Sequence, residues 1–356
     1  MKVRLDKLRQ KLVEEELDAI LITQPENRRY LSGFTGSAGV LLISAEQAIL
    51  ATDFRYYEQA AREAPYFQLA KIKSEEKFVD ILPHLVAQVG ARQVGFESAH
   101  LTFDQYEEWA KVAEGFDLVP TKEWVEELRA VKDEGELEAI RRAVALADEA
   151  MAHILGFMEP GMTERAVAWE IETYMRTHGA DKAAFDIIVA SGPNGAMPHA
   201  QASDAPIRAD EPIVMDIGAR IDGYHSDLTR TVCLGAPDDR FREIYDIVLR
   251  AQLAAEEGIK AGMTGKEADA LARSVIEEAG YGEYSGHGLG HGVGLAIHEK
   301  PRLSKLSEEV LQPGMVFTVE PGIYLSDWGG VRLEDMVVIG QEGVEVLTQA
   351  SKGVGE

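Results

Sequence analysis

Short apolar runs alternate with helically spaced segments over the first 125 residues. The runs are rich in Ile, Leu and Val and are bounded by polar or glycine positions, a pattern typical of buried strands. We expect strands at Ala19–Thr23, Gly39–Ser44, Ala48–Thr52 and Gln93–Phe96. We expect helices at Phe54–Arg62, Glu75–Val89 and Phe103–Val112. The order of these elements predicts a small mixed α/β domain over residues 1–125.

Residues 126–356 form a second predicted domain, in which two helices precede two strands, twice. Apolar residues at steps of three and four predict its first helix at Leu137, Ile140, Val144, Ala147, Met151 and Ile154. Pro160 and Gly161 end that helix, and Thr163 can cap a second helix that runs to about residue 177. The second pair of helices is expected at Arg240–Ile259 and Thr264–Ala279. The strands are expected at Ile213–Gly218, His225–Cys233, Met315–Tyr324 and Val331–Ile339.

This second domain resembles itself at an offset of about 100 residues. Three pairs share the offset: Thr163 with Thr264, Asp216 with Glu320, and His199 with His298, which are 101, 104 and 99 residues apart. We interpret the pattern as an internal duplication that gives two α-α-β-β half-domains related by a pseudo-two-fold axis. Coincidence among short, common sequences is the alternative. An active site between such halves would draw its residues from both.

The charge and cysteine content exclude several classes of function. The chain has 61 acidic and 36 Lys or Arg residues, which gives a net charge of −25. Such a chain repels phosphate backbones and anionic membranes, so we expect neither a nucleic acid nor a membrane as partner. Cys233, the one cysteine, excludes an internal disulfide and a multi-cysteine zinc site. Charges interrupt the N-terminus, and no apolar run approaches 18 residues, so we expect a cytoplasmic protein.

Four carboxylates in apolar strands are the first candidates for chemistry. Asp216 and Asp227 fall on one predicted hairpin, and Glu320 and Glu334 fall on another. A buried carboxylate is costly unless it meets a cation or hydrogen-bond donors, so Asp216 alone could equally be bonded to backbone or to an arginine. Four converging carboxylates repel one another by several kcal/mol. A pair of divalent metal ions would remove that repulsion.

A glycine-rich segment at residues 286–299 supplies imidazoles. His287 and His291 have the i, i+4 spacing of a zinc-binding helix, but five glycines among residues 286–294 make a helix improbable. We expect a strand or loop in which the backbone approaches a site closely. A single histidine is usually structural, whereas three within this segment, His298 included, favour a function.

These residues, in this order and context, resemble the five metal ligands of the pita-bread metallopeptidases, which include methionine aminopeptidase, aminopeptidase P and prolidase. The resemblance covers residues 130–345, and its five ligand positions show no departure. It rests on Met-Asp-Ile-Gly, Ser-Asp-Leu-Thr-Arg-Thr, His-Gly-Leu-Gly-His-Gly-Val-Gly, Thr-Val-Glu-Pro-Gly-Ile-Tyr and Gly-Val-Arg-Leu-Glu-Asp. The ligands it implies are Asp216, Asp227, His291, Glu320 and Glu334.

Two further features resemble the Xaa-Pro peptidases within that superfamily. One is the segment 191–199, which would place His199 beside the metals. The other is the first domain, because the segments 29–39 and 52–56 are similar to the N-terminal creatinase-like domain of bacterial Xaa-Pro dipeptidases and aminopeptidases P. The fold class expected is therefore α/β (α+β), with a creatinase-like domain before a pita-bread domain.

The resemblance also implies a mechanism. Asp227 and Glu334 would bridge two divalent ions, Asp216 would bind one ion, and His291 and Glu320 the other. Oxygen ligands with a single nitrogen suit Mn²⁺, Co²⁺ or Fe²⁺, with Zn²⁺ also possible. The resemblance favours Mn²⁺ or Co²⁺. A hydroxide between the ions would attack the Xaa-Pro bond, with Glu320 as the proton shuttle.

The remaining predicted site residues surround the metals. His199 and His298 would stabilise the oxyanion, His287 would position the substrate, and Arg332 would orient ligands. The expected partners are short proline-containing peptides and a second copy of the chain, as a homodimer.

Several alternatives stay open. An aminopeptidase P would release one residue from longer X-Pro peptides, whereas a dipeptidase needs a cation for the free carboxylate of proline. Arg302 is a candidate for that cation, although a surface role fits it as well. A non-catalytic binding module or a creatinase-type amidinohydrolase on the same fold would lack the metal ligands that this chain keeps.

Overall fold

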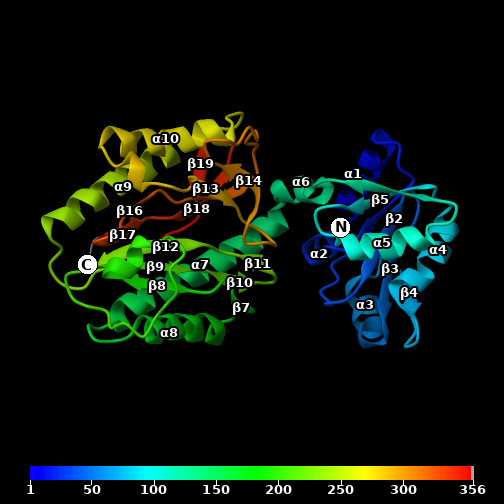
Figure 1. Cartoon of the computed structure of the whole chain (residues 1–356), viewed down its shortest axis with the longest axis horizontal. Helices are drawn as coiled ribbons and strands as arrows, with labels where there is room; N and C mark the ends of the chain where they lie inside the picture. Colours follow the sequence, from blue (N-terminus) through cyan, green and yellow to red (C-terminus); the bar gives the residue numbers. More distant parts are fainter. Residues whose placement is uncertain (354–356) are drawn as a thin grey trace. The chain divides into compact units, whose positions relative to one another are not determined.

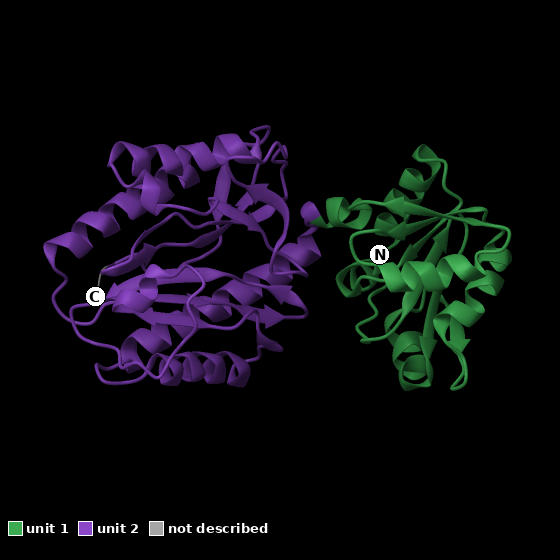
Figure 2. Ribbon diagram, in the orientation of Figure 1, with its two compact units in different colours: residues 1–129 green, residues 130–356 purple. Residues whose placement is uncertain are grey.

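The arrangement of the chain comes from a computed structural model, which describes residues 1–353 (Figure 1). The chain divides into two compact units, unit 1 over residues 1–129 and unit 2 over residues 130–356 (Figure 2). The predicted boundary after residue 125 falls inside helix α6 (Trp124–Ala130). Among the described residues, no helix has both the length and the apolar character needed to span a membrane.

Unit 1 is built on a six-stranded mixed sheet in the order β4-β3-β2-β1-β5-β6. Its strands are β1 (Ala19–Ile22), β2 (Val40–Ser44), β3 (Ala48–Asp53), β4 (Gln68–Ile72), β5 (Gln93–Glu97) and β6 (Asp117–Thr121). The four predicted strands are the central ones. The two strands that the sequence pattern missed, β4 and β6, lie at the edges, where most side chains are only partly buried or exposed. Edge strands therefore lack the continuous apolar run that reveals a central strand.

The helices of unit 1 are α1 (Lys2–Glu14), α2 (Pro25–Ser32), α3 (Tyr57–Glu63), α4 (Phe78–Val89), α5 (Phe103–Val112) and α6. The sequence pattern missed α1, α2 and α6. Of the three predicted helices, α5 has the expected bounds and the other two start differently. The helix predicted to start at Glu75 begins at Phe78, where the Asp80 carboxylate accepts a hydrogen bond from the Lys77 amide and so caps the first turn. The helix predicted from Phe54 opens as a 3₁₀ turn, η1 (Phe54–Tyr56), and continues as α3.

Unit 2 contains the two predicted pairs of helices. They are α7 (Glu134–Phe157), α8 (Glu164–Thr177), α9 (Asp239–Gly258) and α10 (Gly265–Glu278), with the 3₁₀ turns η2 (Gly192–Ala196) and η3 (Gly282–Tyr284). Figure 1 shows α9 and α10 on one side of the strands and α8 on the other. Each pair of helices packs its apolar face against strands of its own half, and α7 also packs against β15 and β18 of the other half.

The internal repeat is visible in the hydrogen bonds between the helix pairs. The Gly161 amide donates to the Ile207 carbonyl at 2.8 Å. In the second half, the Gly262 amide donates to the Leu311 carbonyl at 2.8 Å. Both glycines have a positive φ, 96° and 90°, which side chains rarely tolerate. In each half, therefore, a turn of the same kind joins the two helices, and an equivalent hydrogen bond ties that turn to a later segment of the chain.

The strands of unit 2 are short. They are β7 (Lys182–Ala183), β8 (Ile188–Ser191), β9 (Pro212–Ile217), β10 (Ala219–Ile221), β11 (Tyr224–His225), β12 (Leu228–Cys233), β13 (Gly290–Gly292), β14 (Glu299–Leu303), β15 (Val316–Val319), β16 (Gly322–Leu325), β17 (Gly329–Arg332), β18 (Asp335–Ile339) and β19 (Val344–Val346). The largest sheet has five strands in the order β14-β13-β15-β18-β19. Two sheets have three strands each, in the orders β12-β9-β8 and β11-β10-β7, and β16-β17 form a pair.

Three of the predicted strands are interrupted, which corrects the sequence interpretation. The strand expected at His225–Cys233 is β11 and β12, that at Met315–Tyr324 is β15 and β16, and that at Val331–Ile339 is β17 and β18. The chain changes sheets at each interruption, since β15 pairs with β18 whereas β16 pairs with β17. Periodicity does not reveal such a change, because the apolar pattern continues through it.

Candidate metal centre

Three of the predicted ligands lie where the strands are interrupted. Asp227 lies between β11 and β12, Glu320 between β15 and β16, and Glu334 between β17 and β18. A residue that leaves the ladder is free to aim its side chain away from the usual alternation of faces. The change of sheet therefore turns these carboxylates toward a common point.

Asp227, His291 and Glu334 meet closely enough to hold a metal ion. Each offers one ligand atom, and these atoms all lie within 4.8 Å of one another. Glu320 lies beside these three residues, since its Oε1 is 3.5 Å from His291 Nε2. The residues come from both halves, as expected for a site between duplicated half-domains.

His291 reaches this point because its strand is glycine-rich. A Cβ atom on Gly290 would collide with the Thr318 carbonyl of β15, so only glycine allows the two strands to approach this closely. His291 Nδ1 lies 3.1 Å from the Gly292 carbonyl, which can only accept. In the neutral ring, Nδ1 therefore carries the proton and Nε2 presents its lone pair to Asp227 and Glu320. This is the tautomer that a metal requires.

Asp216 differs from the other ligands because it is bound to an arginine. It lies in β9, opposite Thr229 of β12 rather than opposite Asp227 as the predicted hairpin implied. Its Oδ2 accepts from Arg332 Nη2 at 2.6 Å. Its Oδ1 is buried and has no hydrogen-bond partner. A buried carboxylate oxygen without a hydrogen-bond partner is suited to bind a cation.

The electrostatics of the site also fit cations. Burial, then the charges of Glu334, Asp216 and Glu320, raise the pKa of Asp227 well above its ordinary value. Burial raises the pKa of Glu320 to about 7, and burial raises the pKa of Glu334 well above its ordinary value. Burial lowers the pKa of His291 to about 4, with a contribution from His298. Without metal, each group is therefore driven toward its neutral form, and a divalent ion would reverse that preference for the carboxylates.

The other predicted histidines are His298, His287 and the exposed His199. His298 lies against His291, with ring centres 4.2 Å apart. Partial burial, then the positive charges of Arg302 and His199, lower the pKa of His298. His199 also lowers the pKa of His287, for which burial is the main cause. His199, His298 and Arg302 are thus close enough for their charges to act on one another.

Tyr324 is a site residue to which the sequence assigned no role. Its hydroxyl accepts from Arg332 Nη1 at 3.0 Å and lies 2.9 Å from His287 Nε2. His287 Nδ1 lies 2.7 Å from the Gly288 carbonyl, so a neutral ring accepts the Tyr324 proton at Nε2. The only signal in the sequence was the place of Tyr324 at the end of Thr-Val-Glu-Pro-Gly-Ile-Tyr.

Two threonines donate hydrogen bonds to ligand carboxylates, and an arginine donates to the backbone beside one of them. The sequence did not predict a role for these three residues. Thr229 Oγ1 donates to Glu334 at 2.6 Å, and Thr318 Oγ1 donates to Glu320 at 3.0 Å. Arg230 donates to the Glu334 carbonyl at 2.6 Å and to Asp335 at 2.7 Å. Thr229 and Arg230 belong to the Ser-Asp-Leu-Thr-Arg-Thr sequence that carries Asp227.

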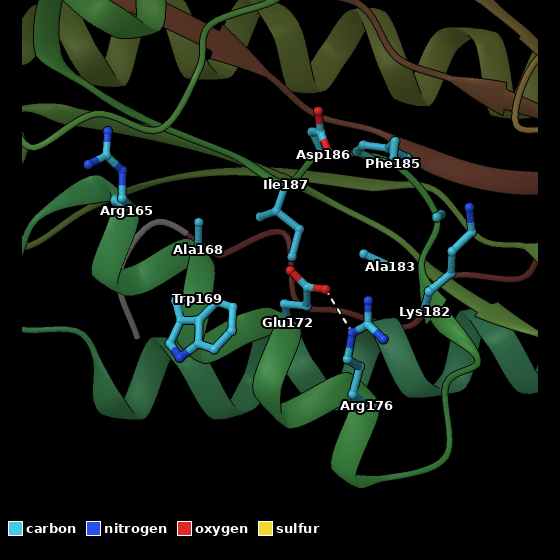
Figure 3. Close-up of a pocket in the computed structure, with 11 residues that line it drawn as sticks. Arg165, Ala168, Trp169, Glu172, Arg176, Lys182, Ala183, Phe185, Asp186 and Ile187 are labelled. Atoms are coloured by element: carbon cyan, nitrogen blue, oxygen red, sulfur yellow. Dashed lines mark hydrogen bonds and ion pairs between the residues drawn. The ribbon is translucent and has the colours of Figure 1, made fainter.

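A separate cavity of about 360 Å³ lies between α8 and the segment 182–187. Figure 3 shows Arg165, Trp169 and Arg176 of α8 around it, with the Glu172–Arg176 ion pair on one wall. None of the predicted site residues lines this cavity. The charged centre described above, and not this cavity, is therefore the candidate site.

Comparisons with known proteins agree with this geometry. The family described as metallopeptidase family M24 matches residues 138–341, and the Creatinase/Prolidase N-terminal domain matches residues 4–131. A Xaa-Pro dipeptidase of Pyrococcus furiosus is 39% identical over 353 residues, which cover 99% of both chains.

Two solved structures are similar over 99% of both chains. One is a Xaa-Pro dipeptidase from Bacillus anthracis, at 45% identity and a TM-score of 0.96. The other is an X-Pro aminopeptidase from Thermotoga maritima, at 38% identity and a TM-score of 0.91. With the family match over unit 2 and a cluster of ligands drawn from both of its halves, the chain belongs to metallopeptidase family M24.

Proposed function

We propose that this protein hydrolyses the Xaa-Pro bond of short peptides, Xaa-Pro dipeptides in particular, with two divalent metal ions. The ligands would be Asp216, Asp227, His291, Glu320 and Glu334. The observation that carries the proposal is a buried group of mutually repelling carboxylates around a neutral imidazole, which needs cations to be stable. The relatives named as Xaa-Pro dipeptidases support the substrate class.

The ligand set favours Mn²⁺ or Co²⁺. Four carboxylates and one imidazole form an oxygen-rich set of ligands. Such a set suits harder ions better than it suits Zn²⁺. Metal analysis of protein reconstituted with each ion, followed by an assay on Xaa-Pro dipeptides, would test both points. An N-acetylated Xaa-Pro peptide is the control, because we expect a free amine to be bound by the acidic site. No bound metal, or equal cleavage of the acetylated peptide, contradicts the proposal.

Bound metal ions would polarise the scissile carbonyl and lower the pKa of a water molecule. Glu320 is placed to move the proton, because Thr318 holds one of its oxygens and His291 lies beside it. It would take the proton released when water attacks and pass it to the departing proline nitrogen. That nitrogen carries no hydrogen in the Xaa-Pro bond, so the transferred proton is what lets it leave as an amine.

His199 and His298 come from the two halves and would donate hydrogen bonds to the oxyanion that forms at the carbonyl. Support for this role is that the His298 ring lies against His291, with ring centres 4.2 Å apart, and that His199 is close enough to lower the pKa of His298. His287, Tyr324 and Arg332 form a hydrogen-bonded chain that ends at Asp216. This chain would orient the substrate and the Asp216 carboxylate.

Arg302 is the observation that favours a dipeptidase over an aminopeptidase P. It lies opposite His291 in the ladder between β13 and β14, and its charge lowers the pKa of His298, so we infer that it can meet the free carboxylate of a bound dipeptide. Arg302→Met should raise KM for an Xaa-Pro dipeptide about tenfold or more and change cleavage of an Xaa-Pro-Xaa tripeptide little. Lys305→Met, an exposed cation three residues further on, is the matched control. Equal effects on both substrates would favour the aminopeptidase instead.

We also propose a cytoplasmic homodimer in which unit 1 of one chain limits access to the other chain's site. Two exposed aromatic residues of unit 1, Phe54 and Tyr66, support an interface there, because large apolar side chains are otherwise seldom left in water. Light scattering at assay concentration tests the dimer, and a fully active monomer would exclude it. Deleting unit 1, residues 1–129, tests the restriction on substrate length, and unchanged length selectivity in a folded remainder would exclude it.

A further inference from the structure

A buried ion pair that plays no part in the chemistry above lies next to His298. Lys132 Nζ is 2.9 Å from Glu299 Oε1, and the two side chains are 0% and 4% exposed. The residues are 167 positions apart. Glu299 directly follows His298 and begins β14, whereas Lys132 directly precedes the cap of α7, Asp133.

The Glu299 carboxylate is part of the turn that carries His298. Its Oε2 accepts from the Ala296 amide at 3.3 Å, and the Ala296 carbonyl accepts from the Gly294 amide at 3.0 Å. A Cβ atom on Gly294 would collide with Glu299 Oε1, so the carboxylate occupies space that only glycine leaves open. The turn at residues 294–299 is therefore folded around this carboxylate.

Lys132 is held in place from the opposite side. Its amide donates to the Gly314 carbonyl at 2.9 Å, and its ammonium also donates to the Ala130 carbonyl at 3.3 Å. Gly314 precedes β15, the strand that leads to Glu320. The ammonium is thus a fixed point to which the Glu299 carboxylate is tied.

A buried ion pair of this kind contributes little net stability compared with apolar side chains of the same size, because both charges lose their hydration. The pair instead restricts the positions of its two side chains, because a charge-assisted hydrogen bond forms only over a narrow range of distances and angles. The arrangement fixed here is that of the turn ending at His298, whose ring must stay against His291.

We propose that Lys132 and Glu299 are positioning residues for His298. The ion pair holds the turn at residues 294–299, and the turn holds the imidazole where the oxyanion forms. This inference rests on the proposed function only for the part that His298 plays in turnover.

The test uses Lys132→Met, Glu299→Gln, the double variant and Lys132→Arg in the full chain. A single variant that leaves one buried charge unpaired can fail to fold, and the neutral double variant avoids this. Lys300→Met is the matched control, because it removes a Lys–Glu pair of 2.8 Å from the same strand.

Two quantities are measured for each variant. The first is kcat and KM on an Xaa-Pro dipeptide. The second is the ring resonance of His298 in ¹³C-histidine-labelled, metal-free protein at one pH, assigned by its loss in His298→Asn. The second readout does not depend on activity.

We expect the double variant to fold, to lose about 10- to 100-fold in kcat with KM within about twofold, and to show a shifted His298 resonance. Lys132→Arg should recover most of kcat, and Lys300→Met should match the wild type in both readouts. A folded double variant with wild-type kcat and an unmoved resonance overturns the proposal. If the wild type cleaves no Xaa-Pro dipeptide, the proposed function fails, and a moved or unmoved resonance still decides whether the pair positions His298.

Discussion

Arg332 donates from Nη2 to Asp216 Oδ2 at 2.6 Å, although the two residues are 116 positions apart and belong to different halves. The same guanidinium donates from Nη1 to Tyr324 at 3.0 Å and to the Pro198 carbonyl at 3.2 Å. Its side chain is only 4% exposed. One buried arginine therefore ties β9, β16 and the residue before His199 into a single network.

Replacing Arg332 should lower activity, and the loss should be larger with methionine than with lysine. Arg332→Lys keeps the charge but loses the planar fork, so we expect kcat/KM to fall about tenfold. Arg332→Met also leaves Asp216 without its partner, and a fall of about 100-fold is expected. Arg141→Met, which removes an exposed arginine of unit 2, is the control in steady-state assays at saturating metal. Equal activity of the lysine variant and the wild type would show that the fork is not used.

His298→Ala should separate catalysis from metal binding. The ring lies against His291 but is not among the proposed ligands, so metal content should stay unchanged. Loss of an oxyanion donor should lower kcat on the order of 10²-fold. Metal analysis and steady-state kinetics on the same preparation check both parts of this prediction. His178→Ala, at an exposed position, is the control. Near-wild-type turnover would make His298 structural.

Metal binding should stabilise the fold, and the effect should disappear with the carboxylates. A ligand at 100 times its Kd stabilises the folded state by about 2.7 kcal/mol, which raises Tm. In Asp227→Asn combined with Glu334→Gln, we expect no metal-dependent rise in Tm. The metal-free Tm of this variant at neutral pH should equal or exceed that of the wild type, because the two amides need not take up protons on folding, whereas the two carboxyl groups, whose pKa values are raised in the fold, must do so. Calorimetry with Mn²⁺ and with chelator makes the comparison, and a preserved metal-dependent rise would refute the ligand assignment.

Unit 1 contains a carboxylate with its own effect on stability. Burial raises the pKa of Glu97 above its ordinary 4.5, although Asn27, Gln24 and Thr23 donate hydrogen bonds to it. The folded protein therefore keeps this proton over a pH range in which the unfolded chain has released it. The contribution to stability is present below pH 4.5 and is lost as pH rises through the folded-state pKa, by at most about 1.4 kcal/mol per pH unit.

Amide hydrogen exchange of residues 19–31 can measure this loss. After correction for the intrinsic rate, protection in the wild type should fall with pH above 4.5 and level off beyond the folded-state pKa. Glu97→Gln should show a flat profile, because the amide does not titrate. Glu107→Gln, at an exposed position on α5, should keep the wild-type slope. Identical slopes in all three proteins would mean that another group is responsible.

Local signals allowed much of this fold to be predicted. Thr163 caps its helix as expected, and Thr264, where the last helix of the repeat was expected to start, caps that helix, because a cap depends only on residues three positions apart. The glycines around His291 excluded a helix, and the segment forms β13 and a turn. The chemistry of the site could be proposed for a similar reason, since acids in apolar strands demand cations wherever the strands lie.

The sequence by itself thus determined the two-part organisation, the repeated helix pairs and the residue types of the site, because these follow from spacing and from the cost of burying charge. Only the tertiary structure decided which charges meet. It pairs Asp216 with Arg332 and Lys132 with Glu299, and it places Tyr324 between His287 and Arg332. It also interrupts three strands so that Asp227, Glu320 and Glu334 face one point. Contacts between residues more than 100 positions apart depend on how sheets pack and exchange strands, and no local period or cap records that.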